Sequence, residues 1–323
     1  MKRNNSLEEI AAALRDARTV LLFPHIAIDG DTLGSSVALC AALRKAGKTA
    51  HVVVEETLPD MVSFLDKGYC TEDPKLPARP DVCICVDCNE YRRFPKRQTL
   101  FRSGALRVCV DHHKTSEPFF DLNYIDGDAA ATAEIVYELI SLLGIEIDKE
   151  IGGAIYVGLV TDTGKFQYSN TTQKTHLIAA RLHEIGVRAS DISILLYQNE
   201  RMEKRLLESR ILGDAERFAD DRAVISRITQ KMLRETGGRL DETDGVVEAL
   251  RDIRGVEVAC LLKEKSARTI KVSLRSKRDF DVAAFSAENG GGGHARAAGF
   301  TVRGRGIDAV KSLLMQQLAD LFS

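Results

Sequence analysis

The sequence lacks the features that would place it in a membrane or among small disulfide-bonded proteins. It contains no run of about 18 apolar residues, so no membrane-spanning helix is expected. The first ten residues, MKRNNSLEEI, are polar and contain no secretory hydrophobic segment. The seven cysteines are an odd number in a chain of 323 residues, which favours reduced thiols and a cytoplasmic protein.

The chain also lacks an excess of either charge, and it has no internal repeat or low-complexity tract. A formal net charge of −2 argues against stable binding of duplex DNA. A local basic patch for a short, highly charged ligand stays compatible with that balance. With 44% hydrophobic and 28% charged residues, the composition is typical of a globular protein large enough for two domains.

The first half of the chain alternates strand-like runs with helix-like stretches. Four runs are almost continuously apolar, which is typical of parallel strands buried on both faces. They cover residues 19–25, 50–56, 81–87 and 105–111. Helices are expected over residues 33–47, 132–144 and 150–162. The pattern predicts a doubly wound α/β domain with a parallel sheet over residues 1–190.

The second half of the chain has a different organisation. Residues 199–218 are strongly charged and are predicted to form a helix that connects two domains, within a linker of residues 191–218. Its apolar face would carry Met202, Leu206, Ile211 and Ala215. Strands are expected over residues 222–228, 256–262 and 269–276, with a final helix over 306–322. Residues 219–323 are therefore expected to form a smaller α/β domain with a mixed sheet.

Acidic and histidine side chains collect where the predicted strands and helices end. They are His25, Asp29 and Asp31, then Asp87, then Asp111, His112 and His113, and finally Asp162. Because ligand sites in parallel sheets lie beyond the carboxyl ends of the strands, three of these clusters should converge. Carboxylates gathered in one cleft would repel each other unless divalent cations compensate their charge. Carboxylates with imidazoles suit Mn²⁺ or Mg²⁺, and two such ions about 4 Å apart activate water for attack on phosphorus.

Each residue also has a structural explanation when taken alone. His25 could be a core histidine, and the aspartates could cap helices or end strands. Cys85 and Cys88 form a C-x-x-C pair, but structural zinc requires further ligands of the same kind. Arg92 and Arg93 lie either at the rim of an anionic cleft or in a solvated loop. The joint pattern favours the two-metal site.

The motifs HIAIDGD, VDCNE, VDHH and GLVTDTGKF, in this order, resemble those of the DHH phosphoesterase superfamily. GGGGHARAAGF, residues 290–300, resembles the signature of the DHH-associated C-terminal domain. The resemblance covers nearly the whole chain and is greatest for the nano-RNase and pAp phosphatase branch. RecJ exonucleases and family II pyrophosphatases are less similar. The resemblance implies two domains with the active site in the cleft between them.

The resemblance also assigns roles to residues. It implies that His25 and Asp29 hold one cation, that Asp31, His112 and Asp162 hold the other, and that Asp87 bridges both. Asp111 would orient a neighbouring imidazole, and His113 would face the scissile phosphate as a hydrogen-bond donor or proton source. Mn²⁺ is the expected cofactor, with Mg²⁺ as the alternative.

Residues of the second domain are expected to bind a further phosphate of the substrate. The candidates are Arg275, Ser276, Gly291, Gly292, Gly293 and His294. Glycine lets backbone N–H groups approach a phosphate, and arginine binds phosphate bidentately. The alternatives are a flexible glycine loop and a solvated strand arginine.

The expected activity is hydrolysis of short single-stranded RNA to nucleoside monophosphates and removal of the 3′-phosphate from pAp (adenosine 3′,5′-bisphosphate). One alternative is a phosphodiesterase of cyclic dinucleotides or their linear products. The other is a non-catalytic nucleotide sensor. The sequence leaves a homodimer open.

Overall fold

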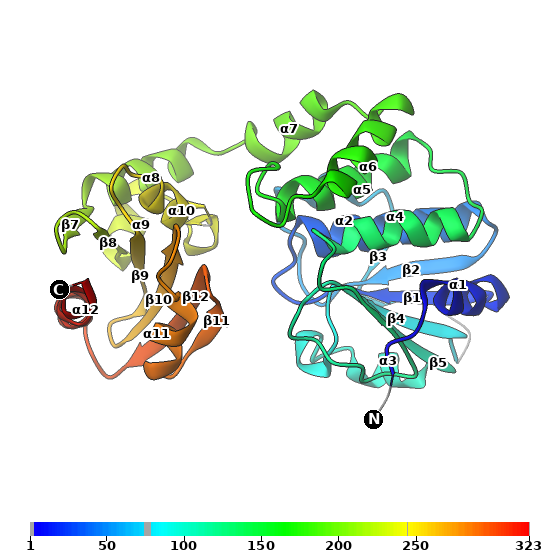
Figure 1. The fold of residues 1–323 in the computed structure, drawn as a ribbon, viewed down its shortest axis with the longest axis horizontal. Coiled ribbons are helices and arrows are strands. Elements are labelled where there is room, and N and C mark those ends of the chain that lie inside the picture. The colour runs from blue at the N-terminus through cyan, green and yellow to red at the C-terminus, as the bar shows by residue number, and fades with distance from the viewer. Residues whose placement is uncertain (1–2, 74–78, 244, 323) are drawn as a thin grey trace. The chain divides into compact units, whose positions relative to one another are not determined.

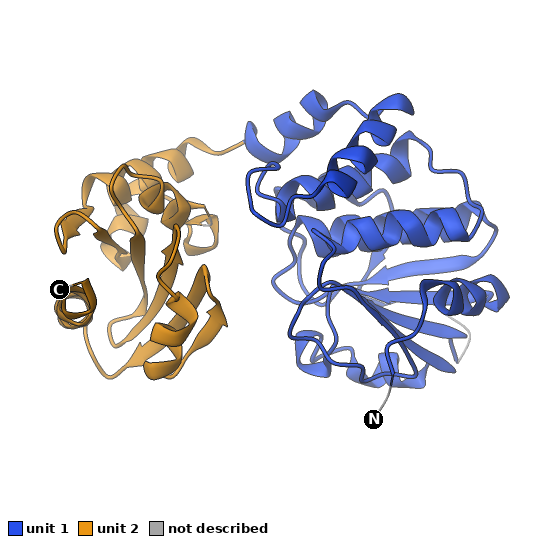
Figure 2. Ribbon diagram, in the orientation of Figure 1, with its two compact units in different colours: residues 1–199 blue, residues 200–323 orange. Residues whose placement is uncertain are grey.

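The structure of the protein is a computed structural model that describes residues 3–73, 79–243 and 245–322. The chain divides into two compact units, residues 1–199 and 200–323 (Figures 1 and 2). In the part of the chain that is described, no helix has the length and apolarity needed to cross a bilayer.

Unit 1 is built on a six-stranded sheet in which every pairing is parallel. Its strands are β1 (Thr19–Phe23), β2 (Thr49–Val53), β3 (Cys70–Thr71), β4 (Val82–Val86), β5 (Leu106–Asp111) and β6 (Leu122–Ile125). The order across the sheet is β3-β2-β1-β4-β5-β6, so the direction of winding reverses between β1 and β4. The four predicted strands and the doubly wound parallel sheet are confirmed.

Helices cover both faces of this sheet, because successive strand residues point to opposite sides. Val20, Leu22 and Ile84 pack in the core that contains α1, α2, α4 and α5, whereas Leu21 and Phe23 pack with Phe101 of α3. The helices are α1 (Leu7–Asp16), α2 (Gly30–Lys45), α3 (Gln98–Ser103), α4 (Thr132–Leu142), α5 (Lys149–Asp162), α6 (Gln173–Glu184) and α7 (Ala189–Tyr197). Two 3₁₀ turns, η1 (Ser63–Leu65) and η2 (Tyr91–Arg93), lie in the loops.

Helix α2 lies at the centre of unit 1 and is buried on every side from Gly30 to Leu43. Glycines allow α2 and α5 to approach closely, because a Cβ at Gly34 would lie 2.5 Å from the carbonyl oxygen of Ala154. Gly158 plays the same part on α5, where a Cβ would lie 2.7 Å from Asp31 Oδ1. This packing fixes Asp31, in the first turn of α2, against the side of α5.

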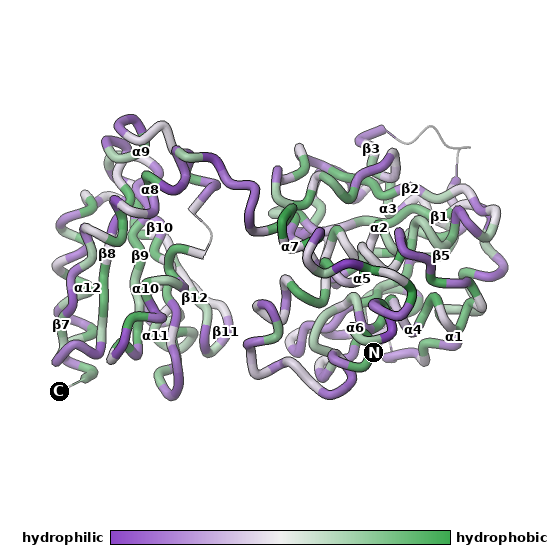
Figure 3. Tube along the Cα trace, turned by 90° about the horizontal axis from the view of Figure 1, so that it is seen from above, coloured by the Kyte–Doolittle hydropathy of each residue, from purple (hydrophilic) through white to green (hydrophobic). Residues whose placement is uncertain are grey.

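Unit 2 contains a mixed sheet in the order β11-β12-β10-β9-β8-β7, as expected for the second domain. Among the described residues of this unit, only β8 and β9 pair in parallel, and their residues are largely hydrophobic (Figure 3). The strands are β7 (Glu216–Phe218), β8 (Ala223–Ile228), β9 (Val258–Ser266), β10 (Thr269–Ser276), β11 (Gly292–His294) and β12 (Ala297–Arg303). The helices are α8 (Met202–Gly213), α9 (Gln230–Thr236), α10 (Val246–Arg251), α11 (Val282–Glu288) and α12 (Ile307–Phe322), with the 3₁₀ turn η3 (Leu240–Thr243).

The segment expected to connect the domains differs from the prediction in length and in its apolar face. Helix α8 ends at Gly213, and the following residues form strand β7. Leu207 and Ile211 are buried in the core of unit 2, whereas Met202 and Leu206 are 70% and 51% exposed. The prediction was therefore wrong for Met202 and Leu206, whereas Ile211 and Ala215 pack in or against the core of unit 2 as predicted.

Candidate active site

Three strands of unit 1 end at one edge of the sheet and bring the predicted acids and histidines together. His25 lies two residues after β1, Asp87 follows β4 directly, and Asp111 is the last residue of β5. β1, β4 and β5 are neighbours in the sheet, and winding reverses between the first two, which is where doubly wound proteins bind ligands. The expected convergence of the three clusters is confirmed.

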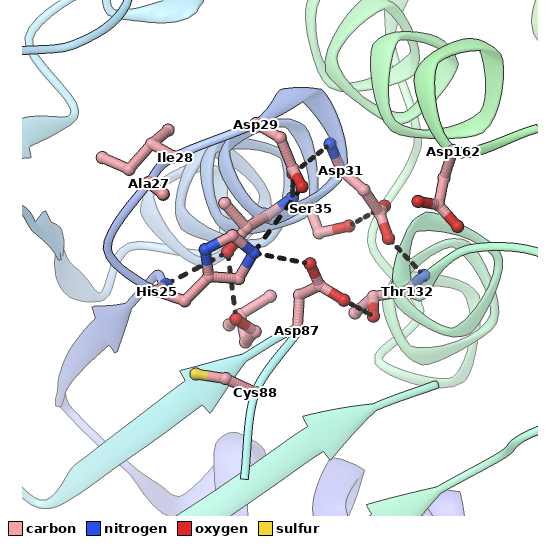
Figure 4. Close-up of polar contacts among 12 residues, drawn as sticks. His25, Ala27, Ile28, Asp29, Asp31, Ser35, Asp87, Cys88, Thr132 and Asp162 are labelled. Carbon is pink, nitrogen blue, oxygen red and sulfur yellow. Dashed lines mark hydrogen bonds and ion pairs between the residues drawn. The ribbon is translucent and has the colours of Figure 1, made fainter. Parts of the chain in front are cut away.

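The first group of possible metal ligands comprises His25, Asp29 and Asp87 (Figure 4). His25 Nε2 lies 3.2 Å from Asp87 Oδ2 and 3.7 Å from Asp29 Oδ2. The ring is held from the other side, where Nδ1 lies 2.8 Å from the carbonyl oxygen of Ile26. Asp29 caps α2 through its Oδ1, which accepts hydrogen bonds from the backbone N–H groups of Asp31 and Thr32. Asp29 can therefore cap α2 and bind a cation at the same time, because the two roles use different oxygens of its carboxylate.

The second group comprises Asp31, His112 and Asp162. His112 Nε2 lies 3.9 Å from Asp31 Oδ2 and 3.6 Å from Asp162 Oδ2. His112 Nδ1 lies 3.2 Å from the carbonyl oxygen of Ala129, which fixes the ring. Helix α5 ends at Asp162 and brings its carboxylate beside Asp31 (Figure 4).

Asp87 faces both groups. Its Oδ2 is the oxygen nearest His25, whereas its Oδ1 lies 3.5 Å from His112 Nε2. The residue has a left-handed backbone with φ of 61°, uncommon outside glycine but better tolerated by aspartate and asparagine. The side-chain hydroxyl of Thr132 donates to Asp87 Oδ1 at 2.9 Å. This geometry suits a carboxylate that bridges two cations.

Helix α4 supports Asp31 in a way that the sequence analysis missed. The backbone N–H groups of Thr132 and Ala133 donate to Asp31 Oδ2 and Oδ1 at 2.7 and 3.0 Å, and Ser35 donates to Oδ1 at 3.1 Å. The first turn of a helix carries partial positive charge, which stabilises a carboxylate. Burial and the charges of Asp87 and Asp162 nevertheless raise the pKa of Asp31 well above its usual value. Nothing in the local sequence of α4 could have identified a contact with a residue about 100 positions away.

Asp111, His113 and Ser116 form a second hydrogen-bonded arrangement beside the metal ligands. Asp111 Oδ1 accepts a hydrogen bond from His113 Nδ1 at 2.7 Å, and Asp111 Oδ2 accepts one from the Ser116 hydroxyl. The hydrogen bond with Asp111 raises the pKa of His113 to about 9. Burial raises the pKa of Asp111, but His113 and Ser116 outweigh that effect and lower it. The hydrogen bond with Asp111 therefore favours the protonated form of His113.

The charges of this site fit divalent cations. Among the described residues, the ion pairs of Asp29, Asp31, Asp87 and Asp162 are all with imidazoles. Asp31 and Asp87 are 1% and 3% exposed, so they gain little from water. Burial raises the pKa of Asp162 to about 6. Carboxylates in this state would be stabilised by divalent cations bound among them.

The cysteines around Asp87 are buried rather than arranged as ligands. Cys83, Cys85, Cys88 and Cys109 pack among phenylalanines in the core on the α3 face of the sheet. Burial raises the pKa of the Cys83 thiol to about 12. Thiols of this kind are unreactive, which supports the choice of carboxylates and imidazoles over a zinc or redox site.

Four of the six second-domain candidates, the three glycines and His294, lie in or next to a hairpin of unit 2, whereas Arg275 and Ser276 end β10. Gly292, Gly293 and His294 form β11, which is exposed and pairs with β12. Gly291 and Gly293 are required by close packing, because a Cβ would lie 2.3 Å from Gly299 O and 2.6 Å from Ala297 O, respectively.

Arg275 and Ser276 already have partners in unit 2. Arg275 Nε donates to Glu248 Oε1 at 2.7 Å, and Ser276, 2% exposed, donates to the carbonyl oxygen of Ala295. Their part in phosphate binding stays a prediction, and it would require Arg275 to exchange or share its carboxylate partner.

A substitution at Gly158 tests how α5 positions Asp31. Gly158→Ala is expected to raise the Mn²⁺ concentration for half-maximal activity about 10- to 100-fold, as loss of ligand support does. Its Cβ would also lie 2.6 Å from that of Ala133. Gly153→Ala is the matched control, because a Cβ there meets nothing within 4 Å. Equal Mn²⁺ titrations for the two variants and the parent would contradict the role of Gly158.

Comparison with known proteins matches both parts of the chain to known domain families. Residues 19–159 match the DHH family, N-terminal domain, and residues 220–320 match the DHHA1 domain. The bifunctional oligoribonuclease and PAP phosphatase NrnA of Thermus thermophilus is 30% identical over 303 residues, which is 93% of this chain and 89% of the relative.

Two solved structures share the fold. An exopolyphosphatase-related protein from Bacteroides fragilis has a TM-score of 0.89 and 25% identity, with 98% of this chain and 97% of that chain covered. RecJ from Thermus thermophilus, solved in complex with Mn²⁺, has a TM-score of 0.61 and 16% identity, with 98% and 54% covered. The order of the motifs, the paired domains and the similarity to NrnA over most of both sequences show that the chain belongs to the DHH family and carries a DHHA1 domain.

Proposed function

We propose that the protein is a phosphoesterase that uses two divalent cations to hydrolyse short RNA to nucleoside monophosphates and to remove the 3′-phosphate of pAp. The observation that carries the proposal is the position of Asp87, whose two oxygens face two groups of possible metal ligands. The name of the NrnA relative supports the substrate class. Mn²⁺ is the proposed native ion and Mg²⁺ the alternative.

The residues of unit 1 divide the chemical work. His25, Asp29, Asp31, His112 and Asp162 would hold the cations, with Asp87 shared between them. When bound, divalent cations at such a site neutralise phosphoryl charge and lower the pKa of a water nucleophile. His113 would donate a hydrogen bond or proton to the phosphoryl group or the leaving oxygen. Asp111 would keep that imidazole oriented and protonated through the 2.7 Å hydrogen bond to Nδ1.

The β11–β12 hairpin would bind a phosphate other than the one that is hydrolysed. His294 is exposed on β11, and Gly292 beside it has open space around its Cα. Binding in a cleft between the two domains remains a prediction. A cytoplasmic location is likewise proposed, supported by the seven unpaired cysteines. A homodimer and the absence of stable duplex binding remain predictions.

A turnover assay with three substrates tests the proposed function. The Mn²⁺-loaded protein is incubated with pAp, a diribonucleotide and a cyclic dinucleotide, and nucleotide products are separated and quantified. We expect adenosine 5′-phosphate from pAp and monophosphates from the diribonucleotide. Turnover of the cyclic dinucleotide alone would favour the phosphodiesterase alternative, and binding without turnover of any would favour the sensor. The complete set of metal-ligand residues argues against the sensor.

Substitution of His294 separates phosphate recognition from chemistry. His294→Ala is expected to lose about 2 kcal/mol, or roughly 30-fold, in kcat/KM on pAp, as loss of a charge-assisted hydrogen bond does. On bis-p-nitrophenyl phosphate, which has no second phosphate, it should lose little. Lys271→Ala, at an exposed position on β10, is the control. Equal losses on both substrates would mean that His294 acts in the chemical step or in folding.

A further inference from the structure

Five cationic side chains follow Asp87 in the loop and helix after β4, and four of them have partners. Arg92 pairs with Glu90 at 2.6 Å, Lys96 and Arg97 donate to backbone carbonyls of Glu55 and Val54, and Arg102 lies over the ring of Tyr91. The fifth is Arg93, at the end of η2. Its side chain is half-buried, yet within the described residues its guanidinium forms no hydrogen bond, ion pair or ring contact. A half-buried cation without a partner carries a desolvation cost that a bound anion would offset.

Arg93 is held beside the first group of metal ligands. Its carbonyl oxygen accepts a hydrogen bond at 2.7 Å from the N–H of Ile26, the residue after His25. The backbone of residue 93 is therefore fixed next to the loop that carries His25.

The two loops that carry His25 and Arg93 are hydrogen-bonded to a pair of glutamates that follow β2. The carboxylate of Glu56 accepts hydrogen bonds from the N–H groups of Ala27 and Ile28 at 2.7 and 3.2 Å. The carboxylate of Glu55 accepts hydrogen bonds from the N–H groups of Lys96 and Arg97 at 3.0 and 2.9 Å. Arg93 is thus presented from an anchored loop, so less order must be gained when it binds.

We propose that Arg93 binds a non-bridging oxygen of the phosphoryl group that is hydrolysed, and is therefore a substrate-binding residue of unit 1. The inference deepens the proposed function and rests on it. The guanidinium has the planar donors that match phosphate, and the backbone of Arg93 is hydrogen-bonded to Ile26, the residue after a proposed metal ligand. It makes no ion pair with Asp29 or Asp87, whose charges the cations would compensate, so its donors stay available for the substrate.

Substitution of Arg93 should therefore lower kcat/KM on a different set of substrates from substitution of His294. A residue that binds the reacting phosphoryl group is needed by every substrate, however small. Arg93→Ala should therefore lose about 10- to 100-fold in kcat/KM on both pAp and bis-p-nitrophenyl phosphate, which corresponds to one charge-assisted contact. Arg93→Lys, which keeps the charge but not the planar donors, should fall between Arg93→Ala and the parent.

The test combines turnover with direct binding of inorganic phosphate to the Mn²⁺-loaded protein by calorimetry. Arg92→Ala is the matched control, because that side chain is 82% exposed and already paired with Glu90. Arg93→Ala should weaken phosphate binding about 10-fold or more. Millimolar guanidinium should partly restore its turnover without affecting the parent. Retention of the Mn²⁺-induced shift in Tm shows that the variant is folded.

Two results would overturn the inference: unchanged phosphate binding, or unchanged hydrolysis of the small ester, whether or not turnover of pAp falls. If the parent cleaves the small ester but neither pAp nor short RNA, the proposed function fails and the role of Arg93 stands. If the parent cleaves nothing, the phosphate-binding comparison still decides whether Arg93 binds the anion.

Discussion

Removal of divalent cations is expected to abolish hydrolysis of pAp and short RNA, and Mn²⁺ should restore it better than Ca²⁺. The reason is the mixed set of carboxylates and imidazoles, since Ca²⁺ prefers ligand sets made only of oxygen. The check is turnover after dialysis against chelator, followed by titration with each ion. Full activity in excess chelator would contradict the two-metal proposal.

Metal removal should also lower the stability of the fold, and the size of this loss should depend on pH. Because burial raises the folded-state pKa of Asp162 to about 6, the metal-free fold binds a proton there more tightly than the unfolded chain does. That stabilising contribution is complete below about pH 4 and is lost as pH rises through about 6. A bound cation replaces the proton, so metal affinity should rise over the same window.

Asp162→Asn makes this dependence measurable. At pH 8 and without metal, the variant should have a higher Tm than the parent, because it lacks the buried charge. Near pH 4 the two should agree. With Mn²⁺ at about 100 times its Kd, the parent gains roughly 2.7 kcal/mol and the order at pH 8 should reverse. If the metal-free variant were less stable than the metal-free parent at pH 8, burial of the Asp162 charge would not explain the raised pKa of this residue.

The sheet of unit 1 could be predicted where the strands are long and covered on both faces. The segments that form β1, β4 and β5 are almost continuously apolar. One sequence is therefore enough to predict them as buried parallel strands. Strand β3 has two residues, Cys70–Thr71, and strand β6 has four, Leu122–Ile125. Neither strand is long enough to show a hydrophobic periodicity. Their places at the edges of the sheet depend on tertiary pairing with β2 and β5.

The metal-ligand residues of the site could be predicted from the sequence, but the hydrogen bonds that support them could not. The strand-end rule places His25, Asp87 and Asp111 at one edge because it depends only on topology. The support for Asp31 from the N-terminus of α4, and the Glu248 partner of Arg275, join positions far apart in the chain. Such contacts leave no local pattern. The same limit applies to Arg93, because nothing in the sequence distinguishes it from the neighbouring Arg92, whose side chain is paired.

Asp87→Asn is expected to lower kcat/KM about 1,000-fold or more, because its carboxylate would serve both cations and so position the water nucleophile. The substitution is nearly isosteric, and asparagine tolerates the left-handed backbone of residue 87, where φ is 61°. Hence the fold should be kept. The metal-free variant should be at least as stable as the metal-free parent, because a buried negative charge beside Asp29 and Asp31 is removed.

The measurement combines kcat/KM, the number of Mn²⁺ ions bound per chain by calorimetry, and Tm in chelator. We expect fewer tightly bound ions in Asp87→Asn, since an amide oxygen is a poor replacement for a bridging carboxylate. Arg92→Ala, exposed and paired with Glu90, should retain parental turnover and metal binding. A lost fold would show as a lower Tm in chelator, which separates it from lost chemistry. Turnover within about threefold of the parent, with two ions still bound, would place Asp87 outside the reacting centre and leave the hydrogen bond from Thr132 as its main role.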